Sequence, residues 1–309
     1  MTKKIRAALL VLAFSAAGIG LAAADPPLYP DVSDNSHATK DIVEEFRAFF
    51  TVKSQHKPDD LMTHFAKANV LYNDATSGGT WPSWDALDKV FHAFLPKAKP
   101  EALSYPTRII GDRRSALVAF TDTPELFGRE LRILGSVSFD ADGKIVRWMD
   151  YWDGRSSHVK NTIKPTYPTD FHDDVGNATG KIADTAKKLG AAFAAADAGA
   201  ATAMFSNDAV YEDMALHAQI LGRLAIGRYL TRALGKVPYG KDASPAHIVG
   251  SDQGGGYEWK APASFPLKRG NTAIELDADG QVTRLTVVYD SSLLADDDYA
   301  ALVKLSAEE

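Results

Sequence analysis

The sequence predicts an α+β fold that is built twice in tandem, with helices packed on the concave face of a curved, mainly antiparallel sheet. Three observations predict it: each half opens with amphipathic helices, each half ends in alternating strands joined by tight turns, and the halves repeat the same motifs in the same order. The chain has 309 residues, 45% hydrophobic and 24% charged, which is ordinary globular composition and allows about two domains.

Composition also excludes several classes of function. A formal net charge of -6, without any Lys/Arg-rich run, offers no attraction to phosphate backbones, so nucleic acid is not expected as a partner. The chain has no cysteine, which excludes thiol chemistry and disulfides. No histidine spacing suits a metal site, and the glycines at 254–256 open no helix and are expected in a bulge or hairpin turn. We therefore expect neither a metal nor a cofactor.

The first 24 residues read as a signal peptide. Three basic side chains stand within positions 3–6, an apolar stretch covers 7–20, and three alanines at 22–24 form a cleavage site before Asp25. The apolar stretch is shorter than the ~20 residues that a spanning helix needs. We expect a mature protein that begins at Asp25, is exported to the periplasm or beyond, and is not inserted stably in a membrane.

The internal repeat divides the chain into two similar halves. The segment 71–74, Leu-Tyr-Asn-Asp, recurs at 210–213 as Val-Tyr-Glu-Asp, and the Asp-Ala-Asp-Gly turn at 140–143 recurs at 277–280. Both copies end their last strand on an aromatic residue followed by aspartate. These endings are Trp152-Asp153 and Tyr289-Asp290.

Each half places its helices before most of its strands. Apolar side chains fall on one helical face in 42–50 and again in 182–193, and a short second helix is expected after each. Strands are predicted at 116–123 and 130–139, around Gly128, and the repeated turns lead into the final strands. The helices that follow the Tyr-x-Asp segments are expected at 83–95 and 223–234.

The domain boundaries follow from composition. Residues 154–180 contain Pro165, Pro168 and scattered polar residues without sustained periodicity, which is typical of a linker. The predicted domains are therefore 25–153 and 181–309.

The order of these elements resembles a known superfamily. Helices, then Tyr-x-Asp on a short strand, a third helix, and a meander that closes on Asp-Tyr-Trp-Asp at 150–153 resemble the nuclear transport factor 2-like superfamily, particularly its SnoaL-like branch. The resemblance implies two cone-shaped domains, each able to hold a small molecule. It also implies a range of activities, since the superfamily includes ketosteroid isomerase, polyketide cyclases, limonene epoxide hydrolase, scytalone dehydratase and members that only bind or assemble.

Asp150 is the leading catalytic candidate. Strand alternation places it on one face with Trp148 and Trp152, which indicates an apolar surface. The second half has Val287 at the matching position, so the fold itself does not need a carboxylate there. A carboxylate among aromatic side chains is expected to have a raised pKa, as a general acid or base near neutrality requires.

Tyr72 and Asp74 are predicted to join Asp150 as catalytic residues. They share a face of their strand, and the resemblance implies that this strand lines the pocket. In ketosteroid isomerase the general base stands at the position matched by Asp74 and Asp213, and limonene epoxide hydrolase has a catalytic aspartate at the position matched by Asp150.

The sequence departs from both of these relatives. The hydrolase has an Arg-x-Asp pair on a middle strand, and the matching stretch here, 121–124, lacks the arginine. The isomerase's carboxylic acid donor falls near Gly135 and Thr272, and its helix tyrosine falls near Ala192 or Phe193, so neither partner is present.

Each candidate also has a structural alternative. Tyr72 and Tyr211 could fill a core with the hydroxyl bonded internally, Asp74 and Asp213 could cap the loops that follow them, and Asp150 could be a buried hydrogen-bond acceptor.

Aromatic residues are predicted to line the first pocket. Trp148, Trp152 and Trp81 are expected to contact the substrate, although aromatic side chains are more often core. Tyr211 and Asp213 are expected to form a weaker second site.

Two functions remain open. One is cofactor-independent acid/base chemistry on a small, mostly apolar molecule, of the isomerase, cyclase, dehydratase or epoxide hydrolase type. The alternative is a non-catalytic protein that sequesters a hydrophobic metabolite. Domains of this superfamily often pair through the outer sheet face, so we expect either an intramolecular pair of the two domains or a homodimer.

Overall fold

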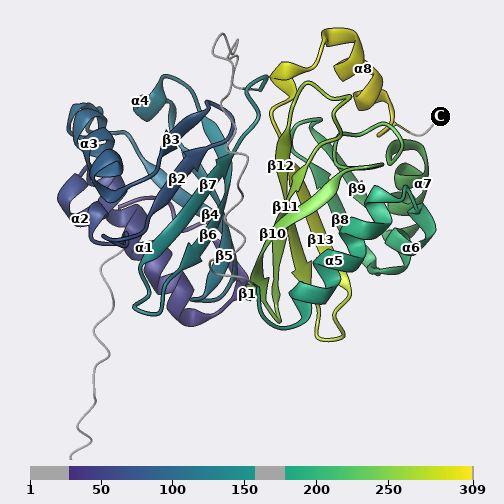
Figure 1. The fold of residues 1–309 in the computed structure, drawn as a ribbon, viewed down its shortest axis with the longest axis horizontal. Coiled ribbons are helices and arrows are strands. Elements are labelled where there is room, and N and C mark those ends of the chain that lie inside the picture. The colour runs from purple at the N-terminus through teal and green to yellow at the C-terminus, as the bar shows by residue number, and fades with distance from the viewer. Residues whose placement is uncertain (1–27, 157–177, 308–309) are drawn as a thin grey trace, which may run out of the picture.

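The computed structural model of the protein describes residues 28–156 and 178–307 (Figure 1). The predicted signal peptide and most of the predicted linker lie outside the described residues. The described chain forms two α+β units, each with its own curved mixed sheet and its own helices, which confirms the predicted fold class.

The first unit contains a seven-stranded sheet in the order β1-β4-β5-β6-β7-β2-β3. Its elements are β1 (Asp34–Ala38), α1 (Lys40–Ser54), α2 (Pro58–Met62), β2 (Leu71–Asp74), β3 (Gly79–Trp81), α3 (Trp84–Phe94), the 3₁₀-helix η1 (Leu95–Lys97), β4 (Ser104–Gly111), β5 (Ser115–Asp122), α4 (Pro124–Phe127), β6 (Leu131–Phe139) and β7 (Ile145–Tyr151). The sequence does not predict β1, because its residues, Asp-Asn-Ser-His-Ala, lack the alternation of apolar side chains that identifies a strand.

The second unit repeats this arrangement with six strands, in the order β10-β11-β12-β13-β8-β9. Its elements are α5 (Lys181–Ala194), α6 (Ala198–Ala203), β8 (Phe205–Asp213), β9 (Ala218–Leu221), α7 (Arg223–Ala233), β10 (Ser244–Ser251), β11 (Gly254–Lys260), β12 (Arg269–Leu276), β13 (Val282–Val288), the 3₁₀-helix η2 (Ser291–Leu293) and α8 (Asp296–Lys304). None of the helices in residues 28–156 and 178–307 is long and apolar enough to cross a membrane.

The repeated turns have the same geometry in both units. The aspartate that opens each turn, Asp140 or Asp277, accepts hydrogen bonds from the N–H groups two and four residues later, at 3.0 and 2.8 Å in both copies. The glycines of the turns have left-handed φ angles of 72° at Gly143 and 82° at Gly280, which a residue with a side chain adopts only under strain. The motif therefore fixes the hairpin that positions each last strand.

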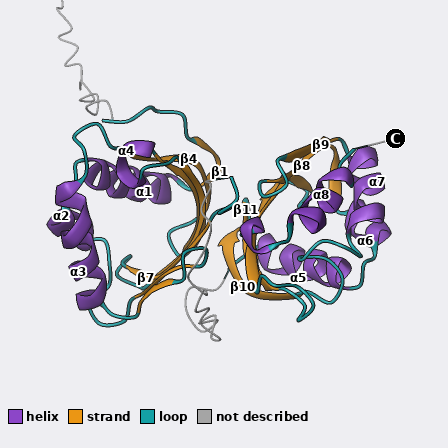
Figure 2. Cartoon of the chain, turned by 90° about the horizontal axis from the view of Figure 1, so that it is seen from above, coloured by secondary structure: helices purple, strands orange, loops and turns teal. Residues whose placement is uncertain are grey.

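The helices lie on the outer sides of the molecule and the two sheets face each other at its centre (Figure 2). Strands β10 and β11 of the second sheet contact β4 and β5 of the first. Between the sheets lies a buried apolar cluster that draws on both units. Its buried members are Ala75, Ile110, Leu117, Leu134, Met149, Tyr151, Val249, Ala273 and Val288.

Glycines in β11 allow the sheets to approach closely. A Cβ atom on Gly256 would lie 2.6 Å from Leu117 Cδ1 of the first unit and 1.9 Å from the backbone oxygen of Thr272, and one on Gly254 would lie 2.9 Å from Ile110 Cγ2. The predicted hairpin turn accounts for Gly254, which pairs with Ser251 where the strand begins. Gly256 lies inside the strand, so a turn does not require it. The close approach of the Thr272 backbone in its own sheet and of Leu117 in the first unit does.

Gly256→Ala is expected to destabilise the protein by about 1–3 kcal/mol, the usual cost of overpacking a closely packed core. Urea unfolding followed by circular dichroism measures this change. Gly235→Ala is the matched control, because a Cβ atom there meets nothing within 4 Å. Equal stability of the two variants would show that neither Thr272 nor Leu117 approaches Gly256 closely.

A fully buried charge cluster joins the two units near this contact. Glu258 Oε1 lies 2.5 Å from an Arg147 nitrogen and Glu258 Oε2 lies 2.5 Å from an Arg269 nitrogen, while Arg269 donates to the Tyr151 hydroxyl at 2.6 Å. Burial raises the pKa of Glu258, but the charges of Arg147 and Arg269 outweigh it and hold this pKa at about 2. The carboxylate of one unit is therefore ionised and paired with an arginine from each unit.

The aspartates that follow the last strands, Asp153 after β7 and Asp290 after β13, also connect the units. The N–H of Gly154 donates to Asp290 Oδ1 at 3.1 Å, and the N–H of Ser291 donates to Asp153 Oδ1 at 2.8 Å. Each aspartate thus holds the backbone that follows the other one.

Candidate active site in the first unit

Two neighbouring strands bring the predicted catalytic residues together. Strands β2 and β7 pair in parallel, with Tyr72 opposite Trp148 and Asp74 opposite Asp150. Alternation directs these side chains to the concave face, where Trp148 and Trp152 belong to the first unit's core. The sequence correctly predicts that Trp148 and Trp152 share one face of the last strand. The residues that alternate with them, Met149 and Tyr151, lie on the opposite face, in the cluster between the sheets.

Asp150 lies at the centre of the group. The Trp148 indole N–H donates to Asp150 Oδ1 at 2.6 Å, and the Tyr72 hydroxyl donates to Asp150 Oδ2. The side chain is buried, with 5% of the residue exposed. A carboxylate can accept more than one hydrogen bond at each oxygen, so both oxygens keep capacity for a ligand.

Asp74 has two kinds of partner. The Trp152 indole N–H donates to its two oxygens at 3.0 and 3.2 Å. Asp74 Oδ1 also accepts from the backbone N–H groups of Thr76 and Ser77, both at 2.9 Å. The capping alternative therefore describes part of what Asp74 does, and the same carboxylate also faces the aromatic residues of the site.

Burial raises the pKa of Asp150 to about 7, and the negative charge of Asp74 adds to the rise, against hydrogen bonds from Tyr72 and Trp148 that lower it. Burial likewise raises the pKa of Asp74. The pKa of Tyr72 lies well above its usual range, because of burial and the nearby Asp150 charge. Near neutral pH both protonation states of Asp150 are consequently accessible, while Tyr72 keeps its proton.

Aromatic rings surround these groups. Tyr72 stacks on Trp148 with ring centroids 5.9 Å apart and planes 8° apart, and Phe49 stacks on Trp148 at 4.8 Å. Trp81 meets Tyr72 edge-on at 5.7 Å. Tyr72, Asp74 and Trp81 are partly exposed, so the cluster reaches the surface through these three residues.

Lys53 and Asp122 form a buried ion pair beside the cluster, which the sequence interpretation missed. Lys53 Nζ, from α1, donates to the two oxygens of Asp122, at the end of β5, at 3.0 and 3.3 Å. The ammonium group also lies 4.9 Å from the centre of the Phe120 ring, which contacts Trp148 edge-on. The cation of this pair comes from a helix, so the spacing of residues along the strands does not reveal it.

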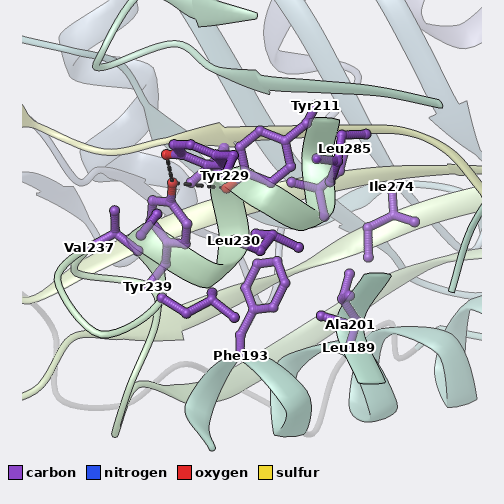
Figure 3. Packing of buried hydrophobic residues seen from close by; sticks show 14 of the residues in the cluster. Leu189, Phe193, Ala201, Tyr211, Tyr229, Leu230, Val237, Tyr239, Ile274 and Leu285 are labelled. Carbon is purple, nitrogen blue, oxygen red and sulfur yellow. Dashed lines mark hydrogen bonds between the residues drawn. The ribbon is translucent and has the colours of Figure 1, made fainter. Parts of the chain in front are cut away.

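In the equivalent region of the second unit, buried tyrosine side chains form hydrogen bonds with one another (Figure 3). Tyr239 donates to Asp213 Oδ2 at 2.8 Å and accepts from Tyr211 at 2.8 Å, and Tyr229 lies 3.2 Å from the same hydroxyl. All four residues are buried, and burial raises the pKa of Asp213 to about 7. The sequence does not predict Tyr239, which lies between α7 and β10 and outside the repeated motifs.

A groove of about 890 Å³ lies between the two units, bordered by β4, β5 and β6 of the first and by the β8–β9 hairpin of the second. Asp213 is the only one of the eight predicted site residues at its border. Among the residues that the structure describes, no three His, Asp or Glu side chains gather as a metal ion would require.

The protein is thus an α+β protein of two similar units. The first unit has a pair of carboxyl groups, Asp74 and Asp150, on the concave face of its sheet. No protein-family model and no curated protein matches the chain. Solved structures do match parts of it, and these carry descriptions such as NTF2-like and cystatin-like fold.

Three of the matching structures show the extent of the similarity. An NTF-2 like protein of unknown function from Burkholderia xenovorans is 16% identical, with a TM-score of 0.31, and the match covers 36% of this chain and 81% of that one. Two others are named as putative enzymes. A ketosteroid isomerase from Kribbella flavida is 18% identical (TM-score 0.29; 35% and 75% covered), and a polyketide cyclase from Sinorhizobium meliloti is 20% identical (TM-score 0.30; 35% and 93% covered).

Proposed function

We propose that the first unit binds a small, mostly apolar molecule and carries out cofactor-independent acid/base chemistry on it. The observation that carries this proposal is the placement of Asp150 opposite Asp74 on paired strands, among aromatic rings, with a pKa of about 7. A carboxyl group with such a pKa can take a proton from a bound molecule and return it at neutral pH. Tyr72 donates to Asp150 and so orients the carboxyl group, and Asp74 raises its proton affinity.

The second unit supports placing the chemistry in the first. It keeps the tyrosine and the aspartate of the shared motif, but it has Val287 where the first unit has Asp150, and its tyrosines and Asp213 are buried and bonded to one another. Isomerisation, cyclisation, dehydration and epoxide opening all require proton transfer of the kind that Asp150 can provide.

Hydrogen–deuterium exchange tests the proposal without knowledge of the natural substrate. The probe is 2-tetralone, an apolar ketone with exchangeable hydrogens beside its carbonyl group, in D₂O, followed by proton NMR. We expect the protein to accelerate exchange, with a rate that rises with pH and levels off above about 7 as Asp150 loses its proton. Binding of the ketone with exchange at the buffer rate would contradict catalysis.

A binding protein without catalysis is the second candidate. It is favoured by one observation: the Tyr72, Trp148 and Trp152 donors are already bonded to Asp150 and Asp74, so none of the three is free to polarise a ligand. Native mass spectrometry of the protein purified from its own host separates the candidates. A single retained compound supports sequestration, whereas a pair related as substrate and product supports catalysis.

We also propose that the chain is exported, on the strength of its leader sequence. N-terminal sequencing of the protein from its host is expected to begin at Asp25. A protein that begins at Met1 would contradict export through this leader.

A further inference from the structure

The repeat provides an internal control for the buried ion pair of the first unit. Five buried residues of α1 have a buried counterpart in α5, each pair 140 positions apart. They are Ile42 and Ile182, Phe46 and Ala186, Phe49 and Leu189, Phe50 and Gly190, and Lys53 and Phe193. The buried cation of the first unit is therefore an apolar ring in the second.

The acidic partner is likewise absent from the second unit. Val118 pairs with Gly135 and then with Asp150 across the first sheet, as Tyr257 pairs with Thr272 and then with Val287 across the second. Val118 and Tyr257 are therefore equivalent positions. Four residues after each of them stand Asp122 in the first unit and Ala261 in the second.

Three buried ionisable groups, Lys53, Asp122 and Asp150, thus occur together in one unit and are all replaced by apolar residues in its twin. A buried ion pair seldom stabilises a fold more than apolar residues of similar volume would. Since the second unit builds the same fold without this pair, its presence in the first is better explained by binding.

Lys53 has hydrogen-bonding capacity to spare on the face of the sheet that carries Asp150. Val118, Phe120 and Asp122 alternate onto the concave face of β5, the face that also carries Asp150. An ammonium group has three N–H donors, and Asp122 is the only hydrogen-bond acceptor that Lys53 contacts within residues 28–156 and 178–307. At least one donor therefore remains for an oxygen atom of a bound molecule.

We infer that Lys53 is a ligand-binding residue, and that its ammonium group binds a carbonyl, enolate or phenolate oxygen of a small molecule held in the first unit. This inference rests on the proposed function, because it places the ligand in the same site. Asp122 is a positioning residue that holds the lysine side chain over Phe120. The pairing suits proton removal by Asp150, since a positive charge near the oxygen stabilises the negative charge that develops there.

The probe for this inference is 4-nitrophenol, whose phenolate form absorbs visible light. Bound to the protein, it is expected to have a lower pKa than in water, because the lysine favours the phenolate. Lys53→Met is expected to raise the pKa of the bound probe by about 1–3 units, a 10- to 1000-fold loss of preference for the phenolate. Lys53→Arg keeps the charge and is expected to keep most of the preference.

A double variant that carries the residues of the second unit, Lys53→Phe with Asp122→Ala, guards against misfolding as the cause. It is expected to unfold in urea at or above the wild-type midpoint and to lose the phenolate preference. The inference is wrong if the wild-type protein does not bind 4-nitrophenol, if Lys53→Met leaves the pKa of the bound probe unchanged, or if the double variant is markedly less stable. The exchange of 2-tetralone is a separate measurement. If that exchange depends on Asp150, the proposed function stands even when the 4-nitrophenol experiment contradicts the role of Lys53.

Discussion

Asp150→Asn is expected to lower the exchange of 2-tetralone by about 10²–10⁴-fold, because asparagine cannot take or return a proton at neutral pH. Proton NMR in D₂O measures the loss. Asp142→Asn is the matched control, since Asp142 is exposed in the turn between β6 and β7 and the chemical change is the same. Full exchange activity in Asp150→Asn, with the fold intact by circular dichroism, would remove Asp150 from the proposed mechanism.

The same variant has a predictable effect on the pH dependence of stability. The pKa of Asp150 in the folded protein, about 7, lies above its ordinary value of 3.8, so its contribution to stability is present below that ordinary value and is lost as the pH rises through 7. The asparagine side chain of the variant does not titrate in this way. Relative to wild type, the variant should therefore gain about 3 kcal/mol between pH 5 and pH 8.

Urea unfolding at the two pH values tests this expectation. A direct loss is superimposed on it at both values. Tyr72 and Trp148 donate to different oxygens of Asp150, and asparagine has an NH₂ group in place of one of them. A difference between wild type and variant that does not depend on pH would show that Asp150 is not perturbed by its surroundings.

The layered fold could be predicted because local patterns and the repeat agree with each other. The helical spacing in α1 and α5, and the turns that contain Gly143 and Gly280, each specify the same structure twice. Strand β1 could not be predicted, since its pairing with β4 depends on a neighbour far along the chain and its own residues are polar.

The candidate site was partly predictable for the same reason. Alternation along the last strand gave the facing of Trp148, Asp150 and Trp152, and the comparison with Val287 marked Asp150 as unnecessary for folding. The same comparison, applied to the first helix of each unit, shows that Lys53 stands at the position equivalent to Phe193. It was missed because a lysine near the end of a helix ordinarily faces solvent.

The contact between the sheets was the least predictable part. Arg147, Glu258 and Arg269 alternate onto the sheet face away from the helices, where charged residues are ordinarily solvated. They are buried because the two sheets pack against each other. Of the two expected arrangements, an intramolecular pair or a homodimer, we propose the intramolecular pair because of this packing.

Glu258→Gln is expected to destabilise the protein by about 3–5 kcal/mol at pH 7, because it leaves Arg147 and Arg269 buried without their counter-charge. The pKa of Glu258 in the folded protein, about 2, lies below its ordinary value of 4.5, so its contribution to stability is present above that value and is lost as the pH falls towards 2. The difference between wild type and variant should shrink over that range. Glu130→Gln, at an exposed ion pair with Arg132, is the control and should change stability by less than about 1 kcal/mol. If Glu258→Gln were as stable as Glu130→Gln at pH 7, this carboxylate would not contribute to holding the two sheets together.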